Sequence, residues 1–178
     1  ALCDVDSGHL EKASGIVNQY YKNNDCRTYK DYREFLEKEK IDALCISVPD
    51  HWHSITYVAA ANKKIDIWGE KPLARSIGEG QQIVKAVQKN KIIWQTGSWQ
   101  RSVANFHKGA ELVFNGRIGK VDHVEVGLPN AAKLIGMPPV QAAPAEPNWD
   151  FCLGSPPKVD YRGGGHRHWR SWPDYSGG

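Results

Sequence analysis

Short apolar segments with the character of β-strands alternate with amphipathic helical segments through the first half of the chain. The clearest strand is Ile41 to Val48, where apolar residues run almost without interruption. Such a run is typical of a strand covered on both faces, as in a parallel sheet, because a half-exposed strand alternates apolar with polar residues. Strands that alternate with helices form βαβ units. The sequence therefore predicts a doubly wound α/β sheet, with further strands that end near Cys3, Trp68 and Gln95.

Four helices are expected between these strands. Asp31 with Glu34, and Ser76 with Glu79, have the spacing of capping boxes, in which each of the two side chains bonds the backbone N–H of the other residue. The apolar residues expected to face the sheet are Leu10, Ala13, Ile16, Val17, Tyr20 and Tyr21; Tyr32, Phe35 and Leu36; Ile55, Val58 and Ala59; and Ile83, Val84 and Val87.

The pattern changes after Gln95. A helix that carries Val103 and Phe106 is followed by Val121 to Leu128, where apolar and polar residues alternate as in a half-exposed strand. We therefore expect residues 1–97 to form the doubly wound sheet and residues 98–178 to begin a second, α+β domain. Because the chain opens inside an apolar segment, we expect an internal piece of a longer protein.

The composition argues against several classes of protein. The 23 Lys and Arg against 20 Asp and Glu give a formal net charge of only +3, whereas nucleic-acid and membrane-surface binders carry clustered basic residues. The longest apolar stretch, about Ala43 to Val48, is far shorter than the roughly 20 residues that cross a bilayer. Cys3 and Cys45 lie in expected buried strands and none of the cysteines forms a CxxC pair, so structural roles are favoured over disulfides or metal binding.

Polar residues that directly follow the strands are the candidate site residues, because ligands of doubly wound sheets bind beyond the carboxyl ends of the strands. Asp4 could accept hydrogen bonds from ribose hydroxyls, although a helix N-cap is the commoner role for such a residue. His51 and His53 follow Pro49 and could relay a proton or bond a substrate hydroxyl. On these residues alone, capping the next helix or packing beside Trp52 is favoured.

Glu70-Lys71-Pro72 follows the strand that ends at Trp68. A lysine at this edge could hydrogen-bond a substrate hydroxyl and take its proton while the carbon gives up hydride, if partial burial disfavours the charged form. Glu70 would then orient the ammonium group. The alternative is a solvated ion pair at a turn, which is how most such pairs behave.

Six motifs follow one another in the chain: Asp4-Val-Asp6, Val48-Pro-Asp-His-Trp-His53, Glu70-Lys-Pro-Leu73, Gln95-Thr-Gly-Ser-Trp-Gln-Arg-Ser102, Gly116-Arg-Ile-Gly-Lys-Val121 and Asn148-Trp-Asp-Phe-Cys-Leu-Gly154. Their order and combination resemble the glucose-fructose oxidoreductase, inositol dehydrogenase and rhizopine catabolism (Gfo/Idh/MocA) family of NAD(P)-dependent oxidoreductases. The resemblance implies a Rossmann-type domain over residues 1–97 and the beginning of a substrate and oligomerisation domain over residues 98–178.

The resemblance also implies a role for each candidate residue. It makes Lys71 the catalytic or substrate-orienting group. It places Gln95 and Arg101 beside the substrate pocket, together with Trp99, which stands where relatives often have Gln or a smaller residue. The residues that it assigns to the cofactor are the ribose-binding Asp4, then Pro49 and His53 beside the nicotinamide, and Glu70, Lys71 and Pro72.

The activity that the resemblance implies is hydride transfer between NAD or NADP and a secondary alcohol of a sugar, amino-sugar or cyclitol. NAD is favoured, because the charge of Asp4 would repel a 2′-phosphate. An NAD-dependent glycoside hydrolase of the same fold and a non-catalytic carbohydrate-binding relative stay open as alternatives. We further expect a homo-oligomer when full length, cytoplasmic or exported in a bacterium, with no metal, no nucleic acid and no membrane insertion.

Two parts of such a site are expected outside these residues: a glycine-rich loop before Ala1, and an Asp and a His beyond Gly178. The absent first strand is central in the order 3-2-1-4-5-6, so two interior strand edges would be unpaired. Aromatic and polar residues near the domain junction could contact a sugar ring, or could instead fill the core and a solvated loop. They are Trp94, Trp99, Arg101, His166, Arg167, His168, Trp169 and Trp172.

Overall fold

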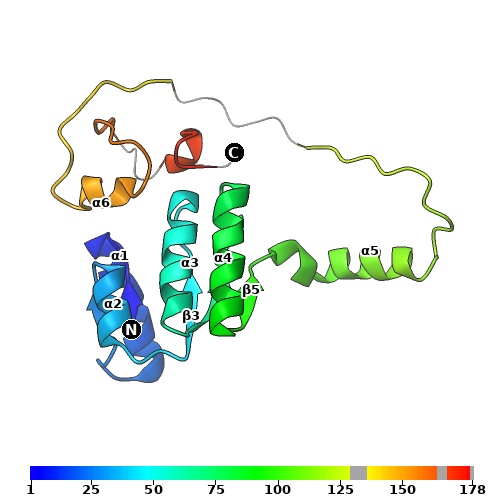
Figure 1. Ribbon diagram of the computed structural model, residues 1–178, viewed down its shortest axis with the longest axis horizontal. Coiled ribbons are helices and arrows are strands. Elements are labelled where there is room, and N and C mark those ends of the chain that lie inside the picture. The colour runs from blue at the N-terminus through cyan, green and yellow to red at the C-terminus, as the bar shows by residue number, and fades with distance from the viewer. Residues whose placement is uncertain (129–135, 164–167, 177–178) are drawn as a thin grey trace.

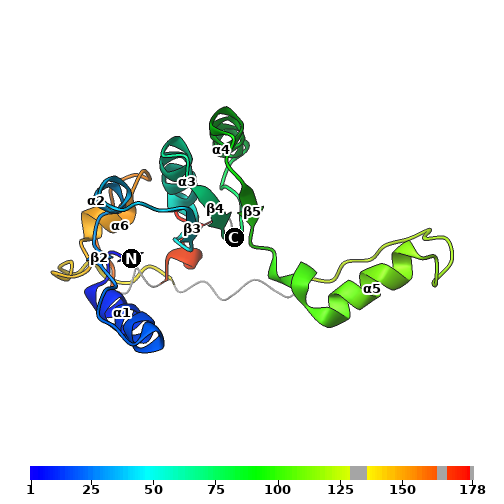
Figure 2. The same ribbon diagram turned by 90° about the horizontal axis from the view of Figure 1, so that it is seen from below.

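The computed structural model describes residues 1–128, 136–163 and 168–176. Its core is a layered α/β arrangement in which helices cover short parallel strands (Figure 1). Residues 104–128, a helix followed by an extended segment, project as an arm from one side of this core, and the last described residues, 168–176, lie back against the core (Figure 2).

The strands form two parallel sheets. In the first, β1 (Leu2–Cys3) pairs with β2 (Thr28–Tyr29), and in the second the order is β3 (Ala43–Ile46), β4 (Asp66–Gly69), β5 (Trp94–Thr96). In the doubly wound strand order 3-2-1-4-5-6, β2 and β1 occupy positions 3 and 2, and β3, β4 and β5 occupy positions 4, 5 and 6. No described strand occupies position 1. A cavity of about 670 Å³ is lined by both β1 and β3 at this position. The prediction of a doubly wound sheet without its central first strand is confirmed.

Six α-helices and three short 3-10 helices are described. The capping box at Ser76 and Glu79 is confirmed, whereas Asp31 caps its helix alone because Glu34 pairs instead with Lys38 at 2.6 Å. The helices are α1 (Ser7–Tyr21), α2 (Tyr32–Lys38), η1 (Asp50–Trp52), α3 (His53–Asn62), α4 (Ile77–Asn90), η2 (Trp99–Ser102), α5 (Ala104–Phe114), α6 (Trp149–Leu153) and η3 (Trp169–Ser171).

The core lies between α2, α3 and α4 and the strands β3 and β4. The predicted face of α2 is largely correct, since Phe35 and Leu36 are buried. The predicted face of α3 is confirmed only in part: Val58 and Ala59 are partly buried and pack against the core, but neither they nor Ile55 are fully buried. The buried stripe begins instead at the histidine that starts the helix, because that side chain is fixed between two loops at the sheet. It consists of His53, Thr56, Tyr57, Ala60 and Ala61.

The other two predicted faces are confirmed only in part. In α4, Ile83 is buried, but Val84 is 45% exposed, and Ala86 takes its place in the core. In α1 only Leu10 is fully buried and Ala13 and Val17 are partly buried, whereas Ile16, Tyr20 and Tyr21 are exposed, Tyr20 to 78%. The reason is that α1 packs on a sheet of two very short strands, which is too small to cover a helix of four turns.

The second half of the chain departs most from the prediction. Residues 121–128 form no strand, and α5 buries none of its residues. An amphipathic strand is stable only against a partner, and nothing in the described part of the chain pairs with this one. Cys3 and Cys45 are likewise exposed, and only Ile46 of β3 is buried, because both strands border the unfilled position. The domain boundary near residue 97 stays a prediction.

Gly69 at the end of β4 offers a test of the core packing. A Cβ atom there would stand 2.9 Å from Cζ of the fully buried Tyr57 and 3.1 Å from Cη2 of Trp94. We expect Gly69→Ala to lower the free energy of unfolding of the intact protein by about 1–3 kcal/mol, because neither ring can move freely. Gly15→Ala in α1, where a Cβ meets nothing within 4 Å, should stabilise by up to about 1 kcal/mol. Equal urea midpoints for the two variants would contradict this packing.

Candidate active site

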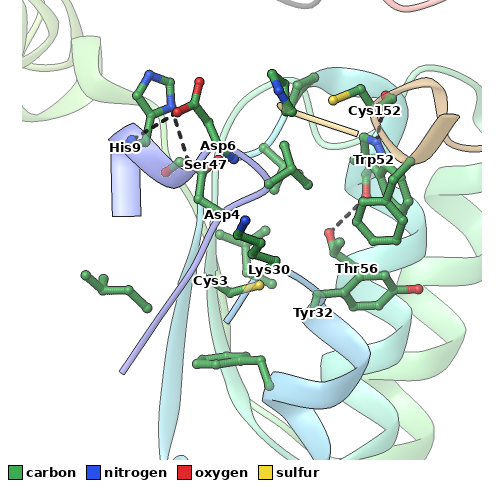
Figure 3. Close-up of a pocket in the computed structure, with 18 of the residues that line it drawn as sticks. Cys3, Asp4, Asp6, His9, Lys30, Tyr32, Ser47, Trp52, Thr56 and Cys152 are labelled. Atoms are coloured by element: carbon green, nitrogen blue, oxygen red, sulfur yellow. Dashed lines mark hydrogen bonds and ion pairs between the residues drawn. The ribbon is translucent and has the colours of Figure 1, made fainter. Parts of the chain in front are cut away.

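The carboxyl ends of the strands carry most of the predicted site residues. Asp4 follows β1, Pro49 follows β3 by three residues, and Glu70 with Lys71 follows β4. Asp4 and Pro49 both line the cavity between the two sheets, as do His9, Lys30 and Trp169. Figure 3 shows Asp4, His9 and Lys30 around this cavity. Lys71 does not line this cavity and lies further along the sheet, at the end of β4.

Asp4 is free to act on a ligand because another residue caps the following helix. Asp6 is the N-cap of α1, and its carboxylate accepts hydrogen bonds from the N–H groups of Gly8 and His9 at 2.8 and 3.1 Å. Asp4 accepts one bond through Oδ1 from the Asp6 N–H at 2.9 Å, and its Oδ2 lies 3.6 Å from His9 Nδ1. The helix-capping alternative for Asp4 is therefore wrong, and a half-exposed carboxylate faces the cavity.

His53 joins the loops that follow β3 and β4. Its side chain is 1% exposed, with Nδ1 at 2.6 Å from the carbonyl oxygen of Pro72 and Nε2 at 2.9 Å from that of Val48. Both ring nitrogens thus face protein carbonyl groups. In this arrangement His53 positions Pro49 and Pro72 relative to each other, and a direct contact of any of the three with a cofactor stays a prediction.

His51 connects the core to two segments from the last part of the chain, around residues 152 and 175. Its ring is 3% exposed, with Nε2 at 2.9 Å from the carbonyl oxygen of Cys152 and Nδ1 at 3.3 Å from that of Tyr175. Trp52 donates its indole N–H to the same Cys152 carbonyl at 3.1 Å. Burial lowers the pKa of His51 from its ordinary value, and the bonds to the two carbonyl groups oppose this effect only in part.

The buried imidazole predicts a pH dependence of stability. Because the folded-state pKa of His51 is lowered from 6.5, the unfolded chain binds a proton more readily, and stability present above about pH 6.5 is lost as the pH falls below it. We expect the melting temperature of the intact protein to fall from about pH 7 to pH 5, and His51→Gln to make this dependence shallower. Parallel curves for wild type and variant would show that another group is responsible.

Glu70 holds its own loop, and the predicted pairing with the Lys71 ammonium is wrong. The Glu70 carboxylate accepts the backbone N–H of Lys71 at 3.1 Å, and no ion pair of Lys71 occurs among the described residues. Tyr57 donates its hydroxyl to the Glu70 carbonyl at 3.1 Å. Lys71 is exposed, so the partial burial required for a proton-accepting lysine is not provided by this part of the chain.

The predicted substrate residues lie near the end of β5 and are open to solvent. Gln95 donates to the carbonyl of Thr96 at 3.1 Å, and Trp99 and Arg101 in η2 are exposed, Trp99 to 82%. Their contact with a substrate stays a prediction. Trp94, in contrast, packs edge-on against Tyr57 with ring centroids 4.7 Å apart, so the core alternative applies to it. His166 and Arg167 lie outside the described residues.

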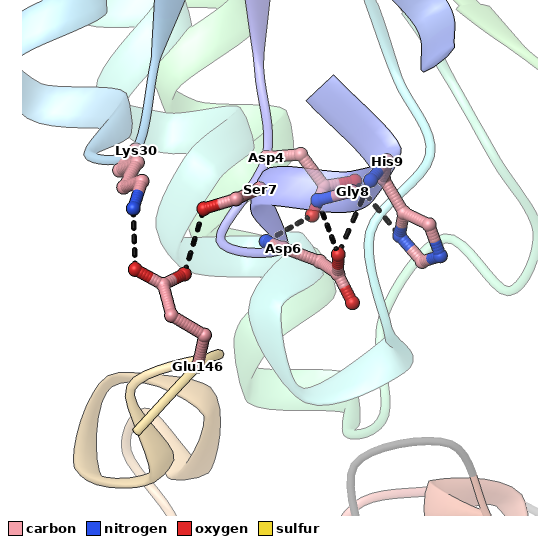
Figure 4. A network of polar contacts seen from close by, with 7 residues as sticks. All are labelled: Asp4, Asp6, Ser7, Gly8, His9, Lys30 and Glu146. Atoms are coloured by element: carbon pink, nitrogen blue, oxygen red, sulfur yellow. Dashed lines mark hydrogen bonds and ion pairs between the residues drawn. The ribbon is translucent and has the colours of Figure 1, made fainter. Parts of the chain in front are cut away.

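Three residues near Asp4 were missed by the sequence analysis. Glu146 accepts hydrogen bonds from Ser7 Oγ at 2.8 Å and from Lys30 Nζ at 2.5 Å (Figure 4). Lys30 could have been found, because it directly follows the second strand, at the carboxyl edge. Glu146 carries no local signal, since it lies more than a hundred residues away in the sequence and only the fold brings it here.

The described residues fit one end of a dinucleotide. The half-exposed carboxylate of Asp4 beside the cavity suits the paired hydroxyls of an adenosine ribose, whereas a nicotinamide beside the loops after β3 and β4 stays a prediction. The glycine-rich turn that holds a pyrophosphate is not found in residues 1–128, 136–163 or 168–176. Strand order and an acidic residue at the end of β1 define the class as dinucleotide-binding α/β proteins.

Comparison with known proteins identifies the family. Residues 1–98 match the model of the Gfo/Idh/MocA oxidoreductase family with its NAD-binding Rossmann fold, and the chain belongs to this family. The resemblance noted from the motifs is thereby confirmed.

Individual relatives agree with this assignment. A myo-inositol 2-dehydrogenase from Thermotoga maritima is 33% identical over 94 residues, which cover 53% of this chain and 28% of the relative. The crystal structure of a myo-inositol 2-dehydrogenase from Lactobacillus plantarum is 28% identical, with a TM-score of 0.59 over 67% of this chain and 34% of that one. A glycosyl hydrolase family 109 protein from Shewanella woodyi is 30% identical over 107 residues, 57% of this chain and 23% of its own length. The chain thus spans about a third or less of these relatives.

None of the described helices is long and apolar enough to span a bilayer.

Proposed function

We propose that the protein containing this chain oxidises a secondary alcohol of a sugar, amino-sugar or cyclitol, with NAD as the hydride acceptor. The observation that carries the proposal is the placement of Asp4. Its carboxylate lines the cavity after β1 and does not cap α1, because Asp6 is the N-cap of that helix. Membership of an NAD-binding oxidoreductase family and the inositol dehydrogenases among its relatives support the substrate class.

In this proposal the chain supplies binding and proton transfer. NAD, when bound, supplies the hydride acceptor. Asp4 accepts hydrogen bonds from the adenosine ribose, and His53 holds the loops of Pro49 and Pro72 together at the end proposed for the nicotinamide. The neutral amine of Lys71 accepts the hydroxyl proton of the substrate and becomes an ammonium group as the carbon gives up hydride; the neutral form is favoured when substrate and the rest of the protein exclude water from this side chain.

The test is a substrate panel with the full-length protein. We expect NADH to accumulate with NAD and a free cyclitol or sugar, and Asp4→Ala to raise the KM for NAD by about tenfold or more. Asp66→Ala would not be a fair control, because Asp66 accepts the Ile93 N–H. The exposed Asp122→Ala is suitable, since the one interaction of the Asp122 side chain within the described part of the chain is with Lys120. An unchanged KM in Asp4→Ala would remove the observation on which the proposal depends.

A glycoside hydrolase is the second candidate, and the relative from Shewanella woodyi supports it. Such an enzyme oxidises and re-reduces its substrate, so it hydrolyses a glycoside without net accumulation of NADH. Release of free sugar from a glycoside at constant NADH would therefore select this alternative. Sugar binding with neither reaction, unaffected by Lys71→Met, would select a non-catalytic binding protein. Assembly into a homo-oligomer stays a prediction.

A further inference from the structure

We propose that Glu146 excludes NADP by occupying the two groups, Lys30 and Ser7, that could otherwise bind its 2′-phosphate. The inference rests on the proposed dinucleotide function and extends it to the choice of cofactor. It assigns a specificity-determining role to a residue far in the sequence from the strands and turns of the nucleotide fold.

The first step is the position of the two groups. Lys30 follows β2 and Ser7 begins α1, so both lie at the carboxyl edge beside Asp4, whose carboxylate is the proposed ribose acceptor. A ribose held by Asp4 would present its 2′-substituent to this neighbourhood. An ammonium group and a hydroxyl are the donors that a phosphate monoester takes in proteins.

The second step is that both donors are already used. Figure 4 shows the Glu146 carboxylate between Lys30 and Ser7, with one oxygen on each: Oε1 lies 2.5 Å from Lys30 Nζ and Oε2 lies 2.8 Å from Ser7 Oγ. The two bonds lower the pKa of Glu146, that from Lys30 most strongly, so the carboxylate stays charged at neutral pH. A 2′-phosphate would have to displace this carboxylate and would meet its negative charge.

The third step concerns the N-terminus of α1, which cannot bind the 2′-phosphate in place of Lys30 and Ser7. Free N–H groups at the start of a helix are a common place for phosphate, but the N–H groups of Gly8 and His9 donate to the Asp6 carboxylate. The carboxylates of Asp4, Asp6 and Glu146 therefore give this edge, where a 2′-phosphate would have to bind, three negative charges. The uncharged 2′-hydroxyl of NAD, in contrast, can donate a hydrogen bond to Asp4.

The experiment measures dissociation constants of NADH and NADPH for the full-length protein by fluorescence titration. Wild type should bind NADH more tightly than NADPH. Glu146→Gln should raise the affinity for NADPH relative to that for NADH by about tenfold or more, because Lys30 becomes available to the phosphate. The double variant Glu146→Gln, Lys30→Met should lose this gain, which separates a contact from a general change of charge.

Asp150→Asn is the matched control. It makes the same chemical change a few residues away, where Asp150 pairs with Lys158 at 3.0 Å in an exposed position outside the cavity, and it should leave the ratio unchanged. The inference is overturned if wild type binds NADPH as tightly as NADH, if Glu146→Gln leaves the ratio unchanged, or if Asp150→Asn or the double variant shows the same gain. A wild type that binds neither dinucleotide would instead overturn the proposed function, and this inference with it.

Discussion

Lys71→Met in the full-length enzyme is expected to lower kcat by about 10²–10⁴-fold, the usual contribution of a positioned proton-transfer group, while NADH still binds. Methionine keeps much of the length and apolar character of the lysine stem but cannot accept a proton. Lys71 is the second residue after β4; its backbone N–H donates to the Glu70 carboxylate, and Tyr57 donates to the Glu70 carbonyl, so the substitution should not disturb the loop. Stopped-flow or steady-state formation of NADH, together with the Kd of NADH, is the measurement.

Lys85→Met is the matched control, because Lys85 is exposed in the middle of α4 and forms no ion pair with any residue that the structure describes. It should leave kcat unchanged. A Lys71→Met enzyme with wild-type kcat, or one that loses NADH binding and turnover together, would contradict the role of Lys71 as proton acceptor. The first result would remove Lys71 from the mechanism, and the second would make it a binding residue only.

Residues 1–178 expressed alone are expected to show no cooperative thermal unfolding and no tight binding of NAD or NADP. β1 and β3 each have one edge without a strand partner among the described residues. The cavity between them is lined by apolar side chains, such as Phe35, Leu36 and Ile46, that a central strand would cover. A whole domain has only about 5–15 kcal/mol of net stability. Large apolar side chains of the arm are exposed as well, Phe114 to 89% and Leu128 to 83%, which favours aggregation.

Differential scanning calorimetry and size-exclusion chromatography test this expectation. The control is the full-length protein under the same conditions, which should melt in a cooperative transition. A sharp, reversible melt of residues 1–178 with micromolar affinity for NAD, about −8 kcal/mol of binding free energy, would show that the two sheets need no strand between them.

The chain's local pattern was enough to predict the class of fold. The alternation of apolar runs with capped helices predicted parallel strands. This works because the spacing of apolar residues and the N-cap residues are local features that can be recognised in the sequence of each element. Ser76 with Glu79 predicted a cap correctly, and Asp4, Pro49, Glu70 and Lys71 were placed at strand ends for the same local reason. The apolar alternation at residues 121–128 misled, because a strand also needs a partner, which no local pattern records.

What only the tertiary structure decided is which groups meet. Sequence could not choose between Asp4 and Asp6 as the cap of α1, since both precede the helix, and only the observed hydrogen bonds give that role to Asp6. His51 and His53 looked equivalent, yet one fixes the returning chain and the other joins two loops. Glu146 meets Lys30 and Ser7 across more than a hundred residues. Such contacts depend on the path of the whole chain, because a side chain acts only on what the fold brings within a few ångströms of it.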